Sequence, residues 1–377
     1  MAEMVAALEG DVRYHIVGAR FRQGGGIPGT AGGAVRLAWS ASVKLRRYPL
    51  GAMAYQRVRG AWTRRSATNG TLVHCCSHLM YGGSPWIGDY ENVNVLGFYS
   101  PRLLRDPRFI EHLGHSLEDP SCRAIRVWSA SAERSFHALF PSPEIRAKLR
   151  VIPPAMAFPP EAGRAHRKDG PPRILFVARG FWIKGGSLFL DALLKLRSRI
   201  DFRADFVCDL PPECRHYRAE LEGIVDFHDP GFSREELFRR FYGTADIFVM
   251  LGMADSYGLA LLEASAFGLP IVAMRLDSGL SDLLRVTGNA IQLEPDHQIF
   301  DRSGVHCVEP AELLRRIQAD SRTPLAGRIA DVLEMLISDR DCRRKLGDRG
   351  RTAILEGCLS TVAMRRSMLD LYAGVMN

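Results

Sequence analysis

From residue 173 onward, short runs of apolar residues alternate with stretches in which apolar residues recur at helical spacing. The apolar runs have no polar face, which is typical of strands in a parallel sheet covered on both sides. The pattern predicts a Rossmann-type domain over residues 173–357. Its expected strands are Arg173–Ala178, Ala204–Cys208, Ile224–Phe227, Ile247–Leu251 and Ile271–Met274, and its expected helices are Gly186–Arg197, Ser233–Tyr242 and Leu259–Phe267.

The first half of the chain is less regular, but it favours a looser version of the same architecture over residues 1–155. Its expected elements are a strand at Tyr14–Ala19, a glycine-rich loop at Gly24–Gly29, a helix from Ala34 to Arg47, and strands at Thr71–Cys75, Trp86–Gly88 and Ala124–Trp128. Three proline pairs then bracket a polar segment. We therefore expect residues 156–172 to be a linker between two α/β domains.

Charge is concentrated at one end of the chain. The 377 residues carry a formal net charge of +8. Residues 1–70 hold eleven basic and three acidic side chains, so the rest of the chain is balanced. A local basic segment fits a membrane surface or an anionic substrate at least as well as nucleic acid, for which the sequence has no binding motif.

Composition narrows the class of protein further. A hydrophobic content of 46% is ordinary for a soluble globular protein, and no apolar run is long enough to span a membrane. The N-terminus has acidic residues where a signal peptide would be basic. Eight cysteines without a CxxC pair favour a reducing compartment. We therefore expect a cytoplasmic protein, with peripheral attachment to the inner face of the membrane as an option.

The first candidate site follows the strand at residues 173–178. Arg179 ends this strand, and Lys184 with Gly185 and Gly186 opens the next helix. Unpaired N–H groups at a helix N-terminus, with two cations, form an anion site that suits a diphosphate. The alternative is a solvated Arg and Lys beside a glycine turn.

The second candidate site runs from Asp255 to Glu263. Gly258 lets the chain turn into a helix, and Glu263 then follows among leucine and alanine residues. A carboxylate in such surroundings is costly unless it has a partner, and the hydroxyl pair of a ligand would provide one. The alternative is an exposed Glu on the solvent face of the helix.

Together these residues resemble the retaining glycosyltransferases of family 4, whose GT-B fold has two Rossmann-like domains facing each other across a cleft. The resemblance covers residues 122–377 well and the first 120 only faintly. It rests on Arg179 with Lys184 and on the stretches at 245–249, 255–263 and 268–273. Leu346-Gly347 and a last helix near Thr361–Tyr372 also fit.

The resemblance implies roles for these residues. Arg179 and Lys184 would hold the donor diphosphate and stabilise the leaving group, so no metal and no other cofactor is expected. Glu263 would accept hydrogen bonds from the ribose, and Asp255, where the family usually has Glu, would contact the transferred sugar. Further donor contacts would come from Gly185, Ser256, Tyr257, Gly258 and Leu259, and from Asp282, which stands where the family tends to have Glu.

The N-terminal domain would supply the acceptor side, and the helix at 361–377 would pack back on it. Gly25 and Gly26 would approach the diphosphate. Asp89 or Glu91 would lie near the reacting carbon, although an acidic pair on a loop is more often solvated than catalytic. Two metal-like patterns, His74–His78 and Asp339–Asp341, lack the ligands or the position that a metal site needs.

The implied function is hexosyl transfer from a nucleotide-diphospho-sugar to an acceptor with retention at the anomeric carbon. The acceptor would be a glycan or a lipid-linked glycan of cell-surface polysaccharide or glycolipid synthesis. Basic residues between 20 and 65 would meet an anionic membrane. Two alternatives stay open: a related enzyme that hydrolyses, phosphorolyses or epimerises its substrate, and a non-catalytic anion-binding protein.

Overall fold

The computed structural model describes residues 47–65, 71–159, 162, 170–320 and 324–376. The strand expected at Tyr14–Ala19, the glycine loop with Gly25 and Gly26, and the helix expected from Ala34 lie outside these residues. The chain divides into two compact units. The N-terminal unit comprises the described residues of Leu8–Ile152, Asp301–Glu309 and Ser367–Asn377, and the C-terminal unit those of Pro153–Phe300 and Pro310–Arg366.

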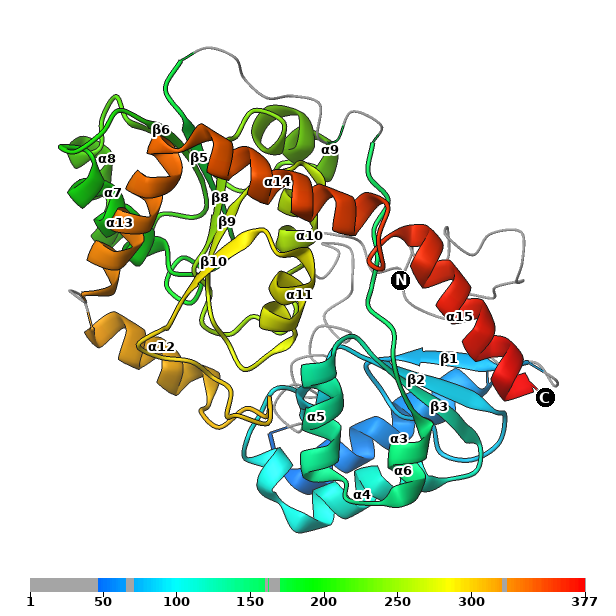
Figure 1. Ribbon diagram of the computed structural model, residues 1–377. Coiled ribbons are helices and arrows are strands. Elements are labelled where there is room, and N and C mark those ends of the chain that lie inside the picture. The colour runs from blue at the N-terminus through cyan, green and yellow to red at the C-terminus, as the bar shows by residue number, and fades with distance from the viewer. Residues whose placement is uncertain (1–46, 66–70, 160–161, 163–169, 321–323, 377) are drawn as a thin grey trace, which may run out of the picture. The chain divides into compact units, whose positions relative to one another are not determined.

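The C-terminal unit contains a six-stranded sheet in the order β10-β9-β8-β5-β6-β7, in which every neighbouring pair is parallel (Figure 1). The doubly wound pattern expected from the sequence is confirmed. The strands are β5 (Arg173–Val177), β6 (Arg203–Val207), β7 (Val225–His228), β8 (Ile247–Met250), β9 (Ile271–Met274) and β10 (Ala290–Leu293).

Helices cover both faces of this sheet. They are α7 (Gly186–Leu196), η3 (Pro212–Cys214), α8 (His216–Glu220), α9 (Arg234–Leu237), α10 (Leu259–Ala266), α11 (Gly279–Thr287), α12 (Pro310–Ala319), α13 (Leu325–Ser338) and α14 (Arg340–Leu355). Right-handed crossovers place α7 and α8 on one face and α9 to α11 on the other. In agreement, α13 packs beside α7, and α14 packs on α10 and α11.

Local sequence explains where several of these helices begin and end. The capping box predicted at Ser233 and Glu236 is present and opens α9. The helix expected over 233–242 does not stay regular, because its second half, Phe238–Tyr242, is a π-turn. Gly268, with φ of +71°, follows α10 and turns the chain back into β9.

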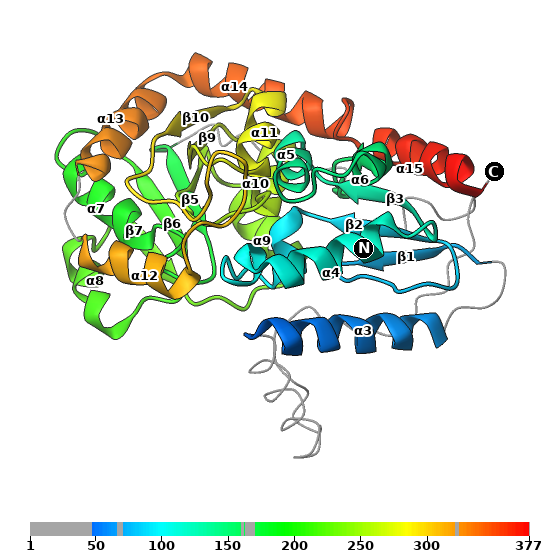
Figure 2. The same ribbon diagram turned by 90° about the horizontal axis from the view of Figure 1, so that it is seen from below.

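The N-terminal unit has a four-stranded parallel sheet in the order β1-β2-β3-β4. The strands are β1 (Val73–Cys76), β2 (Trp86–Tyr90), β3 (Cys122–Val127) and β4 (Leu149–Val151). The helices are α3 (Pro49–Arg65), η1 (Val93–Gly97), η2 (Leu103–Arg105), α4 (Pro107–Glu118), α5 (Ala130–Leu139) and α6 (Pro143–Lys148), and α3 packs beside α4 (Figure 2). The two parallel-sheet units confirm the expected fold class.

Two later pieces of the chain complete the N-terminal unit. The segment Asp301–Glu309 is held by Asn94, whose Nδ2 donates to the carbonyl of Gly304 at 2.9 Å and whose Oδ1 accepts from the N–H of His306 at 2.7 Å. The second piece is the part of helix α15 (Thr361–Met376) that follows Arg366. The residues of α15 up to Arg366 belong to the C-terminal unit. Among the described residues, no helix combines the length and the apolar character that crossing a bilayer requires.

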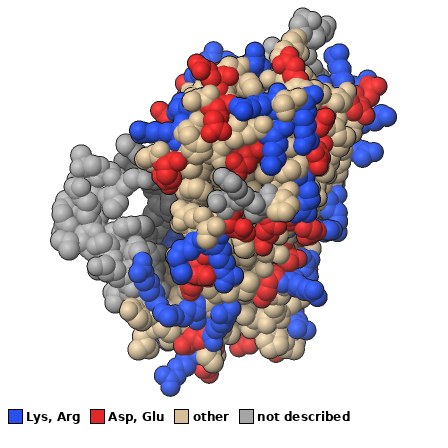
Figure 3. All heavy atoms as spheres, turned by 90° about the vertical axis from the view of Figure 1, so that its left-hand side faces the viewer, with Lys and Arg blue, Asp and Glu red and all other residues tan. Residues whose placement is uncertain are grey.

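On the face that Figure 3 draws, charged side chains of both signs are mixed. Among the described residues, Arg199 pairs with Asp331 at 2.7 Å and with Glu334 at 3.2 Å. Such exposed pairs contribute little to stability.

Candidate functional site

The loop after β5 is built to open α7 without a side-chain cap. Gly185 is the N-cap residue with φ of +76°, and within the described chain no side chain caps this helix. A Cβ on Gly185 would lie 2.6 Å from the Cβ of Leu251 and 2.7 Å from its carbonyl oxygen. Glycine is therefore required by both the backbone conformation and the close approach of the β8 strand end. Arg179 lies exposed at the start of this loop.

The loop after β8 brings the second motif to the first. The N–H of Met253 donates to the carbonyl of Ile183 at 3.1 Å and so joins the two loops. Lys184 Nζ donates to Asp255 Oδ1 in an ion pair. Two sequence-predicted residues, 71 positions apart, are thus in direct contact at the carboxyl ends of β5 and β8. In doubly wound sheets, ligands bind at this end of the strands.

Asp255 has a buried carboxylate with only one of its two oxygens paired in the part of the chain that the structure describes. The residue is 7% exposed, and within the described chain its Oδ2 has no hydrogen-bond partner. Ser278 fixes the backbone here, because its hydroxyl donates to the carbonyl of Asp255 at 2.7 Å. A Cβ on Gly252 would lie 3.0 Å from Asp255 Cγ and closer still to Oδ2. The carboxylate therefore needs the glycine beside it, and it leaves one buried acceptor atom without a hydrogen-bond partner among the described residues.

The helix that follows starts in the expected way. Gly258 is the N-cap residue of α10 with φ of +79°, and no side chain among the described residues caps this helix. Tyr257 is buried, Ser256 is partly buried and Leu259 is 45% exposed. Asp282 lies apart in the first turn of α11, where it pairs with Arg285 at 2.8 Å.

Glu263 lies one turn into α10 and is mostly buried, not on a solvent-exposed face. Arg234 Nε donates to Glu263 Oε1 at 3.1 Å, and the buried hydroxyl of Tyr242 lies nearby. Burial raises the pKa of Glu263, while Tyr242 and Arg234 pull the pKa back down without cancelling the rise. Sequence reasoning missed Arg234, because it belongs to a different helix, α9, and to no motif.

In the N-terminal unit, Asp89 lies inside strand β2 and is buried, so the expectation of a loop residue after the strand is wrong. Its carboxylate accepts from Arg126 Nη1 at 2.6 Å, from Trp128 Nε1 at 2.7 Å and from His74 Nε2 at 3.1 Å. The other ring nitrogen of His74 bonds the hydroxyl of Tyr372 at 2.8 Å. Burial raises the pKa of Asp89, but Arg126, His74 and Trp128 outweigh it and hold the pKa below its ordinary value. The catalytic role of Asp89 stays a prediction.

Glu91, the second N-terminal candidate, does not join this network. It follows β2 on the surface and accepts a hydrogen bond from the hydroxyl of Tyr99. Gly25 and Gly26 lie outside the described residues, so their predicted place near the diphosphate stays a prediction too.

Neither metal-like pattern suits a metal ion. The ligand atoms of His74, Cys76 and Asp89 lie within 4.8 Å of one another, but Arg126 already occupies the carboxylate and burial raises the pKa of the Cys76 thiol to about 12. A cation does not fit beside a guanidinium and a protonated thiol. Asp339 caps α14 by accepting from the N–H of Cys342 at 2.8 Å.

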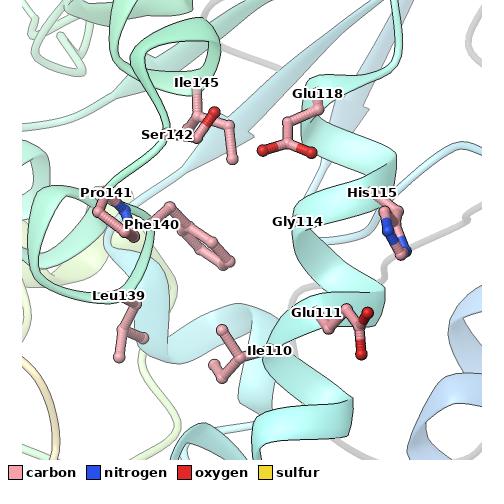
Figure 4. A pocket seen from close by; sticks show the side chains of 10 residues that line it. All are labelled: Ile110, Glu111, Gly114, His115, Glu118, Leu139, Phe140, Pro141, Ser142 and Ile145. Carbon is pink, nitrogen blue, oxygen red and sulfur yellow. The ribbon is translucent and has the colours of Figure 1, made fainter.

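A groove of about 390 Å³ lies in the N-terminal unit (Figure 4). Its apolar lining includes Phe140 and Ile145, and the carboxylate of Glu118 points toward it, whereas that of Glu111 points away. It runs along α4 from Ile110 to Glu118 and reaches the end of α5 and the first turn of α6. Helices that follow parallel strands end at the amino ends of those strands, and ligands of doubly wound sheets bind at the opposite end.

Comparison with known proteins gives one family and a consistent set of relatives. Residues 171–301 match the family described as Glycosyl transferases group 1. An MMP alpha-(1->4)-mannosyltransferase of Mycolicibacterium hassiacum is 30% identical over 240 residues, which cover 62% of this chain and 49% of the relative. A D-inositol 3-phosphate glycosyltransferase of Pseudarthrobacter chlorophenolicus is 31% identical over 150 residues, or 36% of this chain and 35% of the relative. The chain thus matches half or less of the length of these relatives.

Solved structures share the fold at low sequence identity. A glycosyltransferase from Rickettsia africae has a TM-score of 0.58 at 14% identity, covering 88% of this chain and 83% of its own. Anabaena Alr3699/HepE, solved in complex with UDP, has a TM-score of 0.54 at 12% identity, covering 90% of this chain and 82% of its own.

Proposed function

We propose that this protein transfers a sugar from a nucleotide-diphospho-sugar to an acceptor with retention at the anomeric carbon. The premise is that the chain belongs, through residues 171–301, to the Glycosyl transferases group 1 family. The donor would bind in the C-terminal unit at the carboxyl ends of β5 and β8. The relatives that transfer sugars, and the neighbour solved with UDP, support this choice of substrate.

The observation that carries the proposal is the hydrogen bonding of the buried Asp255 carboxylate. Its Oδ1 is paired with Lys184, and its Oδ2 is buried with no hydrogen-bond partner in the described chain. An unsatisfied buried acceptor costs roughly 1–3 kcal/mol, and a hydroxyl of the transferred sugar would satisfy it. The adjoining Lys184 and the uncapped start of α7 then suit the diphosphate.

Two cations at the diphosphate would do what a metal does in other enzymes. Lys184 and Arg179 would neutralise the charge that develops on the leaving nucleotide, so we propose that transfer needs no metal. Activity that survives EDTA is the expected result. Loss of activity that Mn²⁺ or Mg²⁺ restores would contradict this part of the mechanism.

The binding role is tested by calorimetry with UDP, GDP and ADP. Lys184→Ala should weaken the nucleoside diphosphate that binds by about 1.5–3 kcal/mol, the value of a charged hydrogen bond. Arg179→Ala should have a similar effect. Lys195, exposed on the same helix α7, provides the matched control as Lys195→Ala. Unchanged affinity in both site variants would exclude the assignment.

The reaction type needs a separate experiment, because hydrolases, phosphorylases and epimerases of this fold would use the same diphosphate site. The donor is incubated with and without a glycan or lipid-linked acceptor, and the products are separated. Transfer predicts nucleoside diphosphate release that depends on the acceptor, with the product linkage matching that of the donor. Free sugar, sugar phosphate or an epimer in the absence of acceptor would identify one of the alternatives.

We also propose that the N-terminal unit meets an anionic membrane through α3. The helix contains no acidic residue, and Arg57 is exposed on it. Leu50 and Val58 are 77% and 70% exposed, and Tyr48 just before the helix is 66% exposed. Exposed apolar side chains beside cations, without acids, are typical of a helix that lies on a lipid surface.

Vesicle binding tests this surface. Wild-type protein should sediment with phosphatidylglycerol vesicles more than with phosphatidylcholine vesicles, and less at high salt. Leu50→Glu with Val58→Glu should abolish this binding. Val286→Glu, at a 47% exposed valine on α11, controls for an added charge elsewhere. Equal sedimentation of the α3 variant and wild type would contradict the proposal.

A further inference from the structure

Arg234 is fixed by three neighbours at the place where the donor ribose is proposed to bind. Its Nε donates to Glu263 Oε1 at 3.1 Å. Its guanidinium carbon lies 4.9 Å from the ring centroid of Phe238 and 5.6 Å from that of Phe158. All four residues belong to the C-terminal unit. A guanidinium held by two rings and a carboxylate has little freedom to leave.

Glu263 depends on this arginine for its charge. Its side chain is only 14% exposed, so burial disfavours the carboxylate form. Among the described residues, the titratable groups that act on it are Arg234 from α9 and Tyr242 from the π-turn, and both lower the pKa that burial raises. Only Arg234 brings a positive charge. Removing it would therefore raise the pKa of Glu263 further.

We propose that Arg234 is the positioning residue for the nucleoside of the donor: it keeps the Glu263 carboxylate ionised and oriented for the two hydroxyls of a ribose. This inference rests on the proposed function, in which Glu263 accepts hydrogen bonds from the ribose. It adds a residue outside the family motifs, and the preference for a ribonucleotide over its 2′-deoxy counterpart is the property by which the role of that residue can be measured.

The chemistry explains why ionisation matters. An ionised carboxylate is an acceptor at both oxygens and can take both O–H groups of a diol. A protonated carboxyl turns one oxygen into a donor, and hydrogen bonds to its neutral form are about half as strong. A 2′-deoxy nucleotide lacks one of the two O–H groups, so its loss of affinity measures how well Glu263 recognises the diol.

The experiment measures this preference. Calorimetry of the intact protein with UDP, GDP and ADP finds the nucleotide that binds, and its 2′-deoxy counterpart is then compared at pH 6, 7 and 8. Wild type should prefer the ribonucleotide by about tenfold or more at each pH. Arg234→Met should lose most of that preference at pH 6 and recover part of it at pH 8. Arg234→Lys should retain the preference at pH 7, since it keeps the charge.

A matched control separates this role from general loss of packing. Arg240 stacks on the rings of Phe232 and Phe241 at 4.6 and 5.3 Å in the same region. Arg240→Met should leave the ribose preference and its pH profile unchanged, and melting curves show whether each variant is folded.

The outcomes are distinguishable. If wild type binds none of the three diphosphates, the proposed function fails, and this inference with it. If wild type prefers the ribonucleotide and Arg234→Met keeps that preference at every pH, only the inference fails. Tighter binding by Arg234→Met would also overturn it, because Arg234 would then compete with the ribose for Glu263.

Discussion

Gly252→Ala should disable the site while leaving the fold intact. The added Cβ would lie 3.0 Å from Asp255 Cγ and closer to Oδ2, and 3.4 Å from Lys184 Cδ. The atom in the way is the tip of a rotatable side chain, so the carboxylate can turn aside at little cost to the backbone. Turning aside would break its ion pair with Lys184 and move the acceptor proposed for the sugar.

The size of the effect follows from the bonds that are lost. A hydrogen bond to a charged group contributes roughly 1.5–3 kcal/mol. If the bond between Asp255 and the sugar is lost in the transition state, turnover should fall by about tenfold to a hundredfold. Affinity for the nucleoside diphosphate without its sugar should be equal or tighter, because Lys184 is released from Asp255.

The assay compares donor turnover, nucleoside diphosphate affinity and melting temperature in the same preparations. Gly327→Ala is the control, since a Cβ on Gly327 in α13 would meet nothing within 4 Å. It should leave turnover unchanged and slightly raise stability. A Gly252→Ala protein that melts like wild type and turns over its donor at the wild-type rate would refute the role given to Asp255.

Three further predictions concern stability. Arg126→Met should destabilise the N-terminal unit by about 3–5 kcal/mol in a denaturant titration, since it leaves Asp89 a buried carboxylate without its guanidinium; a change below about 1 kcal/mol would contradict this. Gly347→Ala should lower the free energy of unfolding by about 1–3 kcal/mol, because its Cβ would overlap the carbonyl oxygen of Gly268 in the turn after α10. If this variant melts at a temperature no lower than that of Gly327→Ala, α14 simply shifts to make room and the prediction is wrong. Burial lowers the pKa of His306 from 6.5 to about 4. As the pH falls, the unfolded state therefore binds the proton before the folded state does, and up to about 3 kcal/mol of stability is lost between pH 6.5 and 4. In unfolding titrations His306→Gln should reduce the dependence of stability on pH over this range, and an unchanged dependence would count against the prediction.

The C-terminal sheet could be predicted almost residue by residue, because strands buried on both faces appear in the sequence as short apolar runs. β5 to β9 each begin or end within a residue of the expected bounds. The contact between Lys184 and Asp255 follows from the same pattern, since strand ends of a parallel sheet meet at one edge.

Other features could not be predicted, because they depend on partners that are distant in sequence. Strand β2 extends two residues beyond the expected Trp86–Gly88 and includes Asp89, although a carboxylate rarely lies inside a buried strand. Asp89 is accommodated there because Arg126 and Trp128, at the end of the neighbouring strand, bond to it. Arg234 was missed for a similar reason. Propensity and periodicity describe one segment at a time, and these pairs join two.

The inclusion of residues 301–309 in the N-terminal unit has a consequence for biosynthesis. Val305 belongs to the same buried cluster as Trp86, so part of this core is encoded only after all six strands of the C-terminal sheet. On a ribosome the chain up to Ile152 would emerge without Asp301–Glu309 and without the end of α15. Multidomain chains usually fold their N-terminal domain first during synthesis. Here the N-terminal unit stays incomplete while the C-terminal unit is synthesised. Early termination or cleavage near residue 300 would therefore damage both units at once.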